Sequence, residues 1–239
     1  PEPMEKSGIA FRNSIADVCL GVHNEQSAEY LKSCMKVSFD HYDQTREFTR
    51  YIIRHSSRDP LPWALEFAKS VGVRDLVYLA NVLQPALQAA QERGIVLTEK
   101  DRAAVERMVV DLLNTPTRPD VVQTGVEIAG FAKLAKLQPR MLALVNKQKI
   151  SDSLRKASIN ALVAIDAKAA VDPLADLLLN EKETIAIRET VASTLAATNH
   201  PDAHAALVKA LQNAPARLQT TIALGMASSP QGGDRLLQA

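Results

Sequence analysis

The second half of the chain places its apolar residues at the spacing of one helical face. Between residues 154 and 165 these positions are Leu154, Ala157, Ala161, Leu162 and Ile165, which follow the i, i+3, i+7, i+8, i+11 pattern of an amphipathic helix. Residues 171–178 carry a second pattern of the same kind. Because the connection between the two segments is short, we predict a pair of antiparallel amphipathic helices.

This pair of patterns recurs with a period of about 33 residues, which lies in the range of helical repeats. The equivalent positions are Leu154 and Ile187, Arg155 and Arg188, Leu162 and Leu195, Leu174 and Leu207, and Leu178 and Leu211. One helix pair cannot bury the apolar faces of both helices, so successive pairs have to stack on one another. A fixed period of this length is typical of a solenoid of helix pairs. We therefore predict an all-α fold in which the pairs form a right-handed α-α superhelix.

Helical patterns also fill the first half of the chain, although they do not keep this period. We expect helices over residues 9–22, 25–35, 41–55, 60–70, 74–90 and 98–114. Asp59-Pro60 and Thr98-x-x-Asp101 are typical helix starts, and Pro85 predicts either a kink or a division into two short helices. Among the aromatic residues, Phe131 alone lies beyond residue 78, so this half is expected to pack differently.

A segment with two prolines, residues 115–119, separates the two parts. We interpret it as a connection between successive helix pairs, because the helical pattern resumes at once. The predicted organisation is atypical helical repeats over residues 1–117 and regular repeats over residues 118–239, joined in one continuous solenoid. The chain is expected to be a fragment whose last pair is cut short, so that Leu236 and Leu237 face solvent or a neighbouring molecule.

The amino-acid composition excludes some classes of protein but does not indicate a particular reaction. Hydrophobic residues make up 46% of the chain, too many for a disordered protein. There are 28 basic and 27 acidic residues, whereas nucleic-acid-binding proteins carry a concentrated basic excess, so a nucleic-acid partner is not indicated. Residues 218–233, a charge-free run that no other in the chain exceeds in length, are too short and too polar to cross a bilayer, so no membrane partner is expected either.

The stretch PLADLLLNEKETIAIRETVASTLAAT, residues 173–198, resembles a HEAT repeat. It has Pro-Leu and Leu-Leu in one helix, a polar turn, and an aliphatic-Arg pair with Ala and Leu at helical spacing in the next. The resemblance covers the regular repeats and implies a HEAT- or armadillo-like solenoid. Arg155 and Arg188 match the recurrent arginine of this family, whereas Gln123 and Gln219 stand at that position in the flanking units.

The stretch DQTREFTRYIIRHSSRDPLPWALEF, residues 43–67, and the ending ALGMASSPQGGDRLLQA are similar to the helical-repeat region of large secreted bacterial proteins. In those proteins a sugar-dehydrogenase-like propeller precedes the repeats and a c-type cytochrome module follows them. The resemblance implies a periplasmic or extracellular spacer and docking arm within a dehydrogenase-like parent protein. The redox centre would then lie outside this chain.

Two sets of arginines are candidate contact residues. Arg46, Arg50, Arg54 and Arg58 recur every four residues and predict a basic stripe along one helix. This stripe is either a solvated helix face or an interaction surface for an acidic partner or a phosphate backbone. Arg155 and Arg188 are expected to bridge neighbouring units through hydrogen bonds to backbone or a carboxylate. Asp172, Asp176 and Asp202 are expected on or near the second helix of each pair, which forms the concave surface in HEAT-like arrays. They would make part of that surface acidic.

The other chemistry-bearing residues favour structural interpretations. We expect Tyr51, Trp63 and Phe67 to form core rather than a groove, and Cys19 and Cys34 to be buried free thiols rather than a disulfide. His200 and His204 have the spacing of metal ligands on a helix but lack a third ligand. The sequence also lacks a His-Glu dipeptide, a Gly-rich phosphate loop and a Gly-x-Ser-x-Gly elbow.

We therefore predict no catalytic residue, no metal site and no cofactor for this chain. The predicted function is a non-catalytic HEAT-repeat scaffold that binds a protein partner or spaces flanking domains of the same larger protein. The alternative is a nucleic-acid- or phosphate-binding helical-repeat protein that uses the basic stripe.

Overall fold

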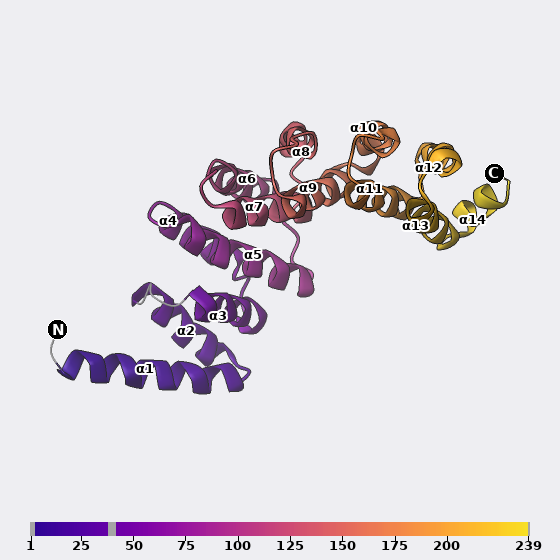
Figure 1. Cartoon of the computed structure of the whole chain (residues 1–239). Helices are drawn as coiled ribbons and strands as arrows, with labels where there is room; N and C mark the ends of the chain where they lie inside the picture. The colour runs from indigo at the N-terminus through magenta and orange to yellow at the C-terminus, as the bar shows by residue number, and fades with distance from the viewer. Residues whose placement is uncertain (1–2, 38–41, 239) are drawn as a thin grey trace. The chain divides into compact units, whose positions relative to one another are not determined.

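The computed structural model describes residues 3–37 and 42–238, and every regular element in these two ranges is a helix (Figure 1). The predicted all-α fold class is therefore confirmed for the described part of the chain. Within the same residues, no helix has the length and the hydrophobicity that a membrane crossing requires.

The helices group into two compact units, residues 1–115 and residues 116–239. The first unit contains α1 (Pro3–Gly21), α2 (Glu25–Val37), α3 (Tyr42–His55), α4 (Leu61–Gly72), α5 (Leu76–Glu92) and α6 (Glu99–Leu113). The second contains α7 (Pro119–Phe131), the 3-10 turn η1 (Ala135–Leu137), α8 (Gln138–Val145), α9 (Asp152–Ile165), α10 (Ala167–Leu179), α11 (Ile185–Thr198), α12 (Pro201–Asn213), α13 (Ala216–Ala227) and α14 (Pro230–Leu237). The division falls inside the proline-containing segment 115–119, two residues before the predicted boundary.

Local sequence signals set most of the helix starts. The Thr98 hydroxyl accepts a hydrogen bond from the Asp101 N–H while the Asp101 carboxylate accepts one from the Thr98 N–H, so the predicted capping box is present. The helix that is expected to begin at Pro60 begins one residue later, because Pro60 occupies the cap position before Leu61. At Pro85, α5 continues as one helix, so the alternative of two short helices is wrong. His41, the expected start of the third helix, lies outside the described residues.

Helices of the second unit pack in two rows. Helices α7, α9, α11 and α13 contact one another in succession, and α10 contacts α12, which contacts α14. In Figure 1 the labels α9, α11 and α13 follow one row, and α8, α10 and α12 follow the other. Leu174 of α10 and Leu207 of α12 stand one period apart and are both fully buried.

Small residues bring neighbouring helices of the first of these rows close together. A Cβ atom added to Gly130 of α7 would lie 2.8 Å from the Cα atom of Ala161 in α9. A Cβ atom on Gly225 of α13 would lie 2.9 Å from the Cβ atom of Ala196 in α11. These backbones approach one another because no larger side chain stands between them.

The first unit is built around α3 and α5, which contact each other along their lengths. Large buried side chains such as Ile52, Leu79 and Leu83 fill the space between helices. Trp63 and Phe67 stack with ring centroids 5.5 Å apart, and both are half-buried. Tyr51 is buried, as expected, but it packs beside the imidazoles of His23 and His55 and not with these two rings.

Candidate functional site

Three of the four stripe arginines lie on one exposed face of α3. Arg46, Arg50 and Arg54 are spaced by four residues, which places them on successive turns of the helix. Arg58 is also exposed but lies in the loop after α3, which ends at His55. The predicted stripe of four along one helix is therefore wrong in its last member.

The guanidinium groups of the stripe contact polar side chains of α5. The hydrogen bonds are Arg46 to Asn81 (3.0 Å) and Gln84 (3.3 Å), Arg50 to Gln88 (3.5 Å), and Arg54 to Glu92 (2.8 Å). The Arg54–Glu92 pair is also an ion pair, and both side chains are about half exposed. Contacts of this kind between exposed groups contribute little stability each, and they direct the three guanidinium groups toward side chains of α5.

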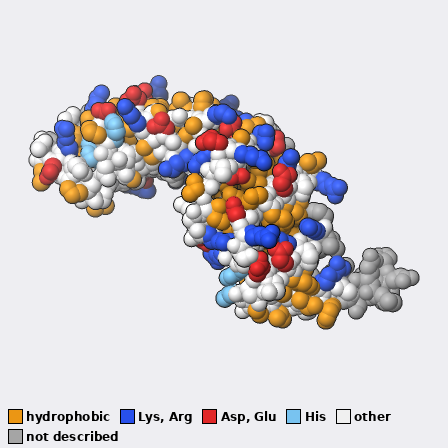
Figure 2. Space-filling view, turned by 180° about the vertical axis from the view of Figure 1, so that it is seen from behind, with side chains coloured by type: hydrophobic (Ala, Val, Ile, Leu, Met, Phe, Trp, Pro, Cys, Tyr) orange, Lys and Arg blue, Asp and Glu red, His pale blue; other side chains and the backbone are white. Residues whose placement is uncertain are grey.

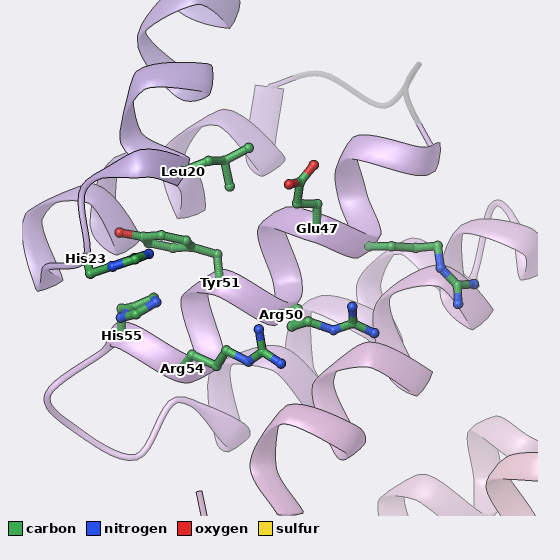
Figure 3. Close-up of a pocket in the computed structure, with 8 residues that line it drawn as sticks. Leu20, His23, Glu47, Arg50, Tyr51, Arg54 and His55 are labelled. Atoms are coloured by element: carbon green, nitrogen blue, oxygen red, sulfur yellow. The ribbon is translucent and has the colours of Figure 1, made fainter. Parts of the chain in front are cut away.

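A pocket of about 420 Å³ opens beside these arginines, between the end of α1, the turn that follows it, and α3. Its lining consists of Leu20, His23, Arg46, Glu47, Arg50, Tyr51, Arg54 and His55. Figure 3 shows the two imidazole rings face to face, with the Tyr51 ring beside them and the Glu47 carboxylate pointing away from Arg50 and Arg54.

The imidazole pair is the least expected feature of this pocket. The ring centroids of His23 and His55 are 4.8 Å apart and the two planes differ by 13°. The Tyr51 ring lies 4.3 Å from that of His55. The Tyr51 hydroxyl donates a hydrogen bond to the Val22 carbonyl oxygen, which ties the turn carrying His23 to α3. This hydrogen bond joins the two segments that carry the aromatic wall of the pocket.

Burial and neighbouring cations both act on His55. Partial burial lowers the pKa of His55 below its ordinary value, and His23, Arg54 and Arg93 lower it further because each disfavours a second positive charge. Arg93 lies close by because its guanidinium donates to the carbonyl oxygens of Ile53 and Ser56. In the absence of an anion, these surroundings favour the neutral form of His55.

Arg155 and Arg188 occupy equivalent positions in the second unit. The Arg155 Nε atom donates to the Val145 carbonyl oxygen at 3.0 Å, and the Arg188 Nε atom donates to the Leu178 carbonyl oxygen at 2.8 Å. Each accepting carbonyl lies at or near the C-terminal end of the preceding helix, where backbone oxygens lack helical partners. Both arginines are buried, so they link helices and do not present a surface.

The glutamine at the equivalent position of the next helix pair makes a related contact. Gln219 Nε2 donates to the Leu211 carbonyl oxygen at 3.0 Å. Arg155 has an additional partner, since its two Nη atoms each lie 2.9 Å from the carboxylate of Glu183 in the loop before α11. The sequence does not indicate Glu183, because the positions one period to either side are Ile150 and Ala216.

Exposed side chains of the second unit include both acidic and apolar groups. Asp172 and Asp176 of α10 and Asp202 of α12 are exposed. On the other row, an apolar groove of about 470 Å³ runs between α7 and α9, with the Phe131 ring 40% exposed at one side. Figure 2 shows acidic and basic side chains interspersed on the visible face of each unit.

The remaining candidates do not form a site. Cys19 and Cys34 are free thiols, but they are half-buried rather than buried as expected, and partial burial raises the pKa of Cys34. His200 caps α12, while His204 is buried with its Nε2 atom unpartnered. Over the described residues, no three His, Cys, Asp or Glu side chains gather closely enough to hold a metal ion.

No family model, no curated protein and no solved structure matches this chain. A proposed function therefore depends on the contacts described above.

Proposed function

We propose that the chain is a non-catalytic HEAT-repeat scaffold that binds a protein partner or spaces flanking domains of a larger protein. The observation that supports it best is the recurrence of one contact at one period. Arg155 and Arg188 stand one period apart and donate to the carbonyl oxygens of Val145 and Leu178, which are separated by the same period. Repetition of buried polar contacts as well as apolar positions is what stacked, equivalent helix pairs require.

The mechanism of such a scaffold is geometric. Each helix pair presents its exposed positions at a regular step, so a partner that spans several pairs meets a row of similar surfaces. A few anchor contacts on that row would supply most of the binding energy. The exposed aspartates of α10 and α12, Asp172, Asp176 and Asp202, favour a partner with basic or polar groups.

The nucleic-acid alternative is less well supported by the contacts of α3. Arg46, Arg50 and Arg54 already donate to side chains of α5, and Arg58 lies off the helix. A phosphate backbone would therefore meet at most three arginines along the helix, each already in contact with a side chain of α5. Titration with duplex DNA at low and at moderate salt separates the two proposals, because binding through the stripe has to weaken steeply with added salt.

Site-specific photo-crosslinking in the cells that make the protein tests the scaffold directly. A photoreactive residue would replace Asp172 or Asp202 on the row of α10 and α12, and Asn160 or Thr220 on the opposite row as matched exposed controls. We expect adducts from one row with one polypeptide or one flanking domain. Equal, scattered labelling from both rows, or adducts with nucleic acid, would overturn the proposal.

A further inference from the structure

We propose that the pocket between α1 and α3 binds a tetrahedral oxyanion of the phosphate type, through Arg50, Arg54 and the stacked imidazole pair. This site differs from the predicted stripe in its residues. It includes His23, contributed from a distant turn, and it excludes Arg58. It also lies in the first unit, so it does not depend on the scaffold proposed for the second.

The charge of the lining favours an anion. Three arginines line the pocket, and Glu47 is the one acid among the described residues that do so. Glu47 points away from Arg50 and Arg54 (Figure 3), and Glu92 forms an ion pair with Arg54 alone, so within the ranges that the structure describes the charges of Arg46 and Arg50 are not neutralised at close range. An excess of fixed positive charge in a concave surface raises the local concentration of anions.

Hydrogen-bond donors remain available in this arrangement. A guanidinium carries five N–H donors, and Arg50 uses one of its Nη atoms in a long 3.5 Å contact with Gln88. Arg54 uses Nε and Nη2 on Glu92, which leaves Nη1. Arginine donors in a fixed fork match the oxygen spacing of phosphate and related oxyanions. The contacts with α5 thus orient the arginines without exhausting their donors.

The parallel imidazoles also suit an oxyanion better than a metal ion. The lone pair of a ring nitrogen lies in the ring plane. Two stacked rings whose centroids are 4.8 Å apart therefore do not direct their nitrogens toward one point about 2 Å from each. Two N–H groups pointing the same way can instead donate to two oxygens of one tetrahedral anion. The geometry therefore favours an acceptor with several oxygens.

Protonation of the His55 imidazole would be coupled to binding. The groups around His55 are His23 from the α1–α2 turn, Tyr51 and Arg54 from α3, and Arg93 after α5, while Glu92 pairs with Arg54 and Glu25 contacts Ser57. The neighbouring cations oppose a proton on His55 when the pocket lacks an anion, and a bound anion reverses that effect. Affinity should accordingly rise as the pH falls below the ordinary imidazole pKa of about 6.5.

The test follows the histidine resonances of the full chain by NMR during titration with sulfate, inorganic phosphate and phenyl phosphate. Sulfate is the probe for the pH series, because phosphate groups themselves gain a proton near pH 6. We expect saturable shifts at His23 and His55 and an increase in the pKa of His55. The affinity for sulfate should be about tenfold higher near pH 5.5 than near pH 8. Inorganic phosphate and phenyl phosphate distinguish a free anion from a monoester.

Matched variants separate this site from the stripe and from general ionic effects. Arg50→Gln should weaken sulfate binding about tenfold, because one charge-assisted donor set is lost. Arg58→Gln, which removes an exposed arginine outside the lining, should leave the affinity unchanged. Glu47→Gln should strengthen binding about two- to threefold, an effect that damaged folding would not produce.

Three outcomes would overturn the proposal. One is a shift of His200 in the second unit parallel to those of His23 and His55, which would indicate a general response to salt. Another is equal weakening by Arg50→Gln and Arg58→Gln. The third is duplex DNA displacing sulfate and binding with the salt dependence of a phosphate-backbone contact, which would assign the arginines to the stripe.

Discussion

The Arg155–Glu183 ion pair is a deeply buried charged contact of the second unit. Its two side chains are 4% and 7% exposed, and the guanidinium donates through both Nη atoms and through Nε. Arg188, its counterpart, forms no ion pair with any carboxylate in the described part of the chain. Hydrogen bonds from Arg155 hold the pKa of the Glu183 carboxyl below its ordinary value. The buried guanidinium of Arg155 therefore pairs with a carboxylate, Glu183, that has no equivalent in the neighbouring helix pairs.

Glu183→Gln should lower the free energy of unfolding by about 3 kcal/mol at neutral pH, because it leaves the Arg155 charge buried without compensation. The depressed pKa means that this stabilisation is present above the unfolded carboxyl pKa of about 4.3 and is lost as the pH falls through the lower folded value. Urea unfolding followed by circular dichroism at neutral and acidic pH measures both effects. The difference between wild type and variant should shrink in acid.

Glu181→Gln provides the matched control in the same loop. Glu181 is exposed, so its substitution should change stability by less than about 0.5 kcal/mol. If the two glutamine variants unfolded alike at every pH, the Arg155–Glu183 ion pair would not stabilise the folded state.

Some of these side-chain contacts follow from the sequence and others do not. The equivalence of Arg155 and Arg188 follows from the period, because both positions repeat with their apolar neighbours. Glu183 has no periodic counterpart, and the pairing of His23 with His55 depends on a turn that brings distant parts of the sequence into contact. Contacts between residues that do not recur at the period can be recognised only in the tertiary structure.

At the scale of helices, close backbone approach controls the packing of α7 on α9. Gly130 faces Ala161 so closely that a single methyl group would overlap the α9 backbone. Alanine ordinarily stabilises a helix relative to glycine by up to about 1 kcal/mol. At Gly130 the overlap opposes that preference. Whether Gly130→Ala raises or lowers the free energy of unfolding therefore shows whether α7 and α9 are in close contact.

Gly130→Ala should destabilise the second unit by about 1–3 kcal/mol, because α7 has to move away from α9 or strain against it. Gly233→Ala is the internal control, since nothing lies within 4 Å of a Cβ atom at that position in α14. Its stability should stay unchanged or rise. Thermal unfolding of both variants beside the wild type gives the comparison, and a stabilising Gly130→Ala would show that the two helices are not in close contact.

The helices themselves are the part of the fold that local sequence patterns predict best. Capping residues such as Thr98 and Asp101 act within one turn, so their effect is visible without tertiary context. Pro85 shows the limit of such rules, because packing on both sides keeps α5 continuous through a residue that usually interrupts helices. The contacts from α3 to α5 were not predictable, since they depend on which face each helix turns toward the other.

For the second unit as a whole, the predicted repeat leads to the expectation that helix pairs are interchangeable. If α13 and α14 are equivalent to α11 and α12, removal of one period should let the last pair occupy the place of the pair before it. The spacing from α11 to α13 is shorter than a full period. The residue equivalent to Arg188 is Gln219, whereas a full period would place Thr221 there. Deletion of residues 186–216 joins Ile185 to Arg217 and preserves this register.

The deletion keeps each buried position apolar, because Leu218, Ile222 and Met226 replace Ile187, Val191 and Leu195, all fully buried. Gln219 then stands where Arg188 donated to the Leu178 carbonyl, and Glu183 stays with Arg155. We expect a shortened protein that keeps its helicity per residue and unfolds cooperatively, as stacked repeats do when one is removed. Deletion of residues 188–216 shifts the register by two and turns apolar positions toward solvent, so it should lose cooperative unfolding. Equal behaviour of the two deletions would mean that the period carries no structural equivalence.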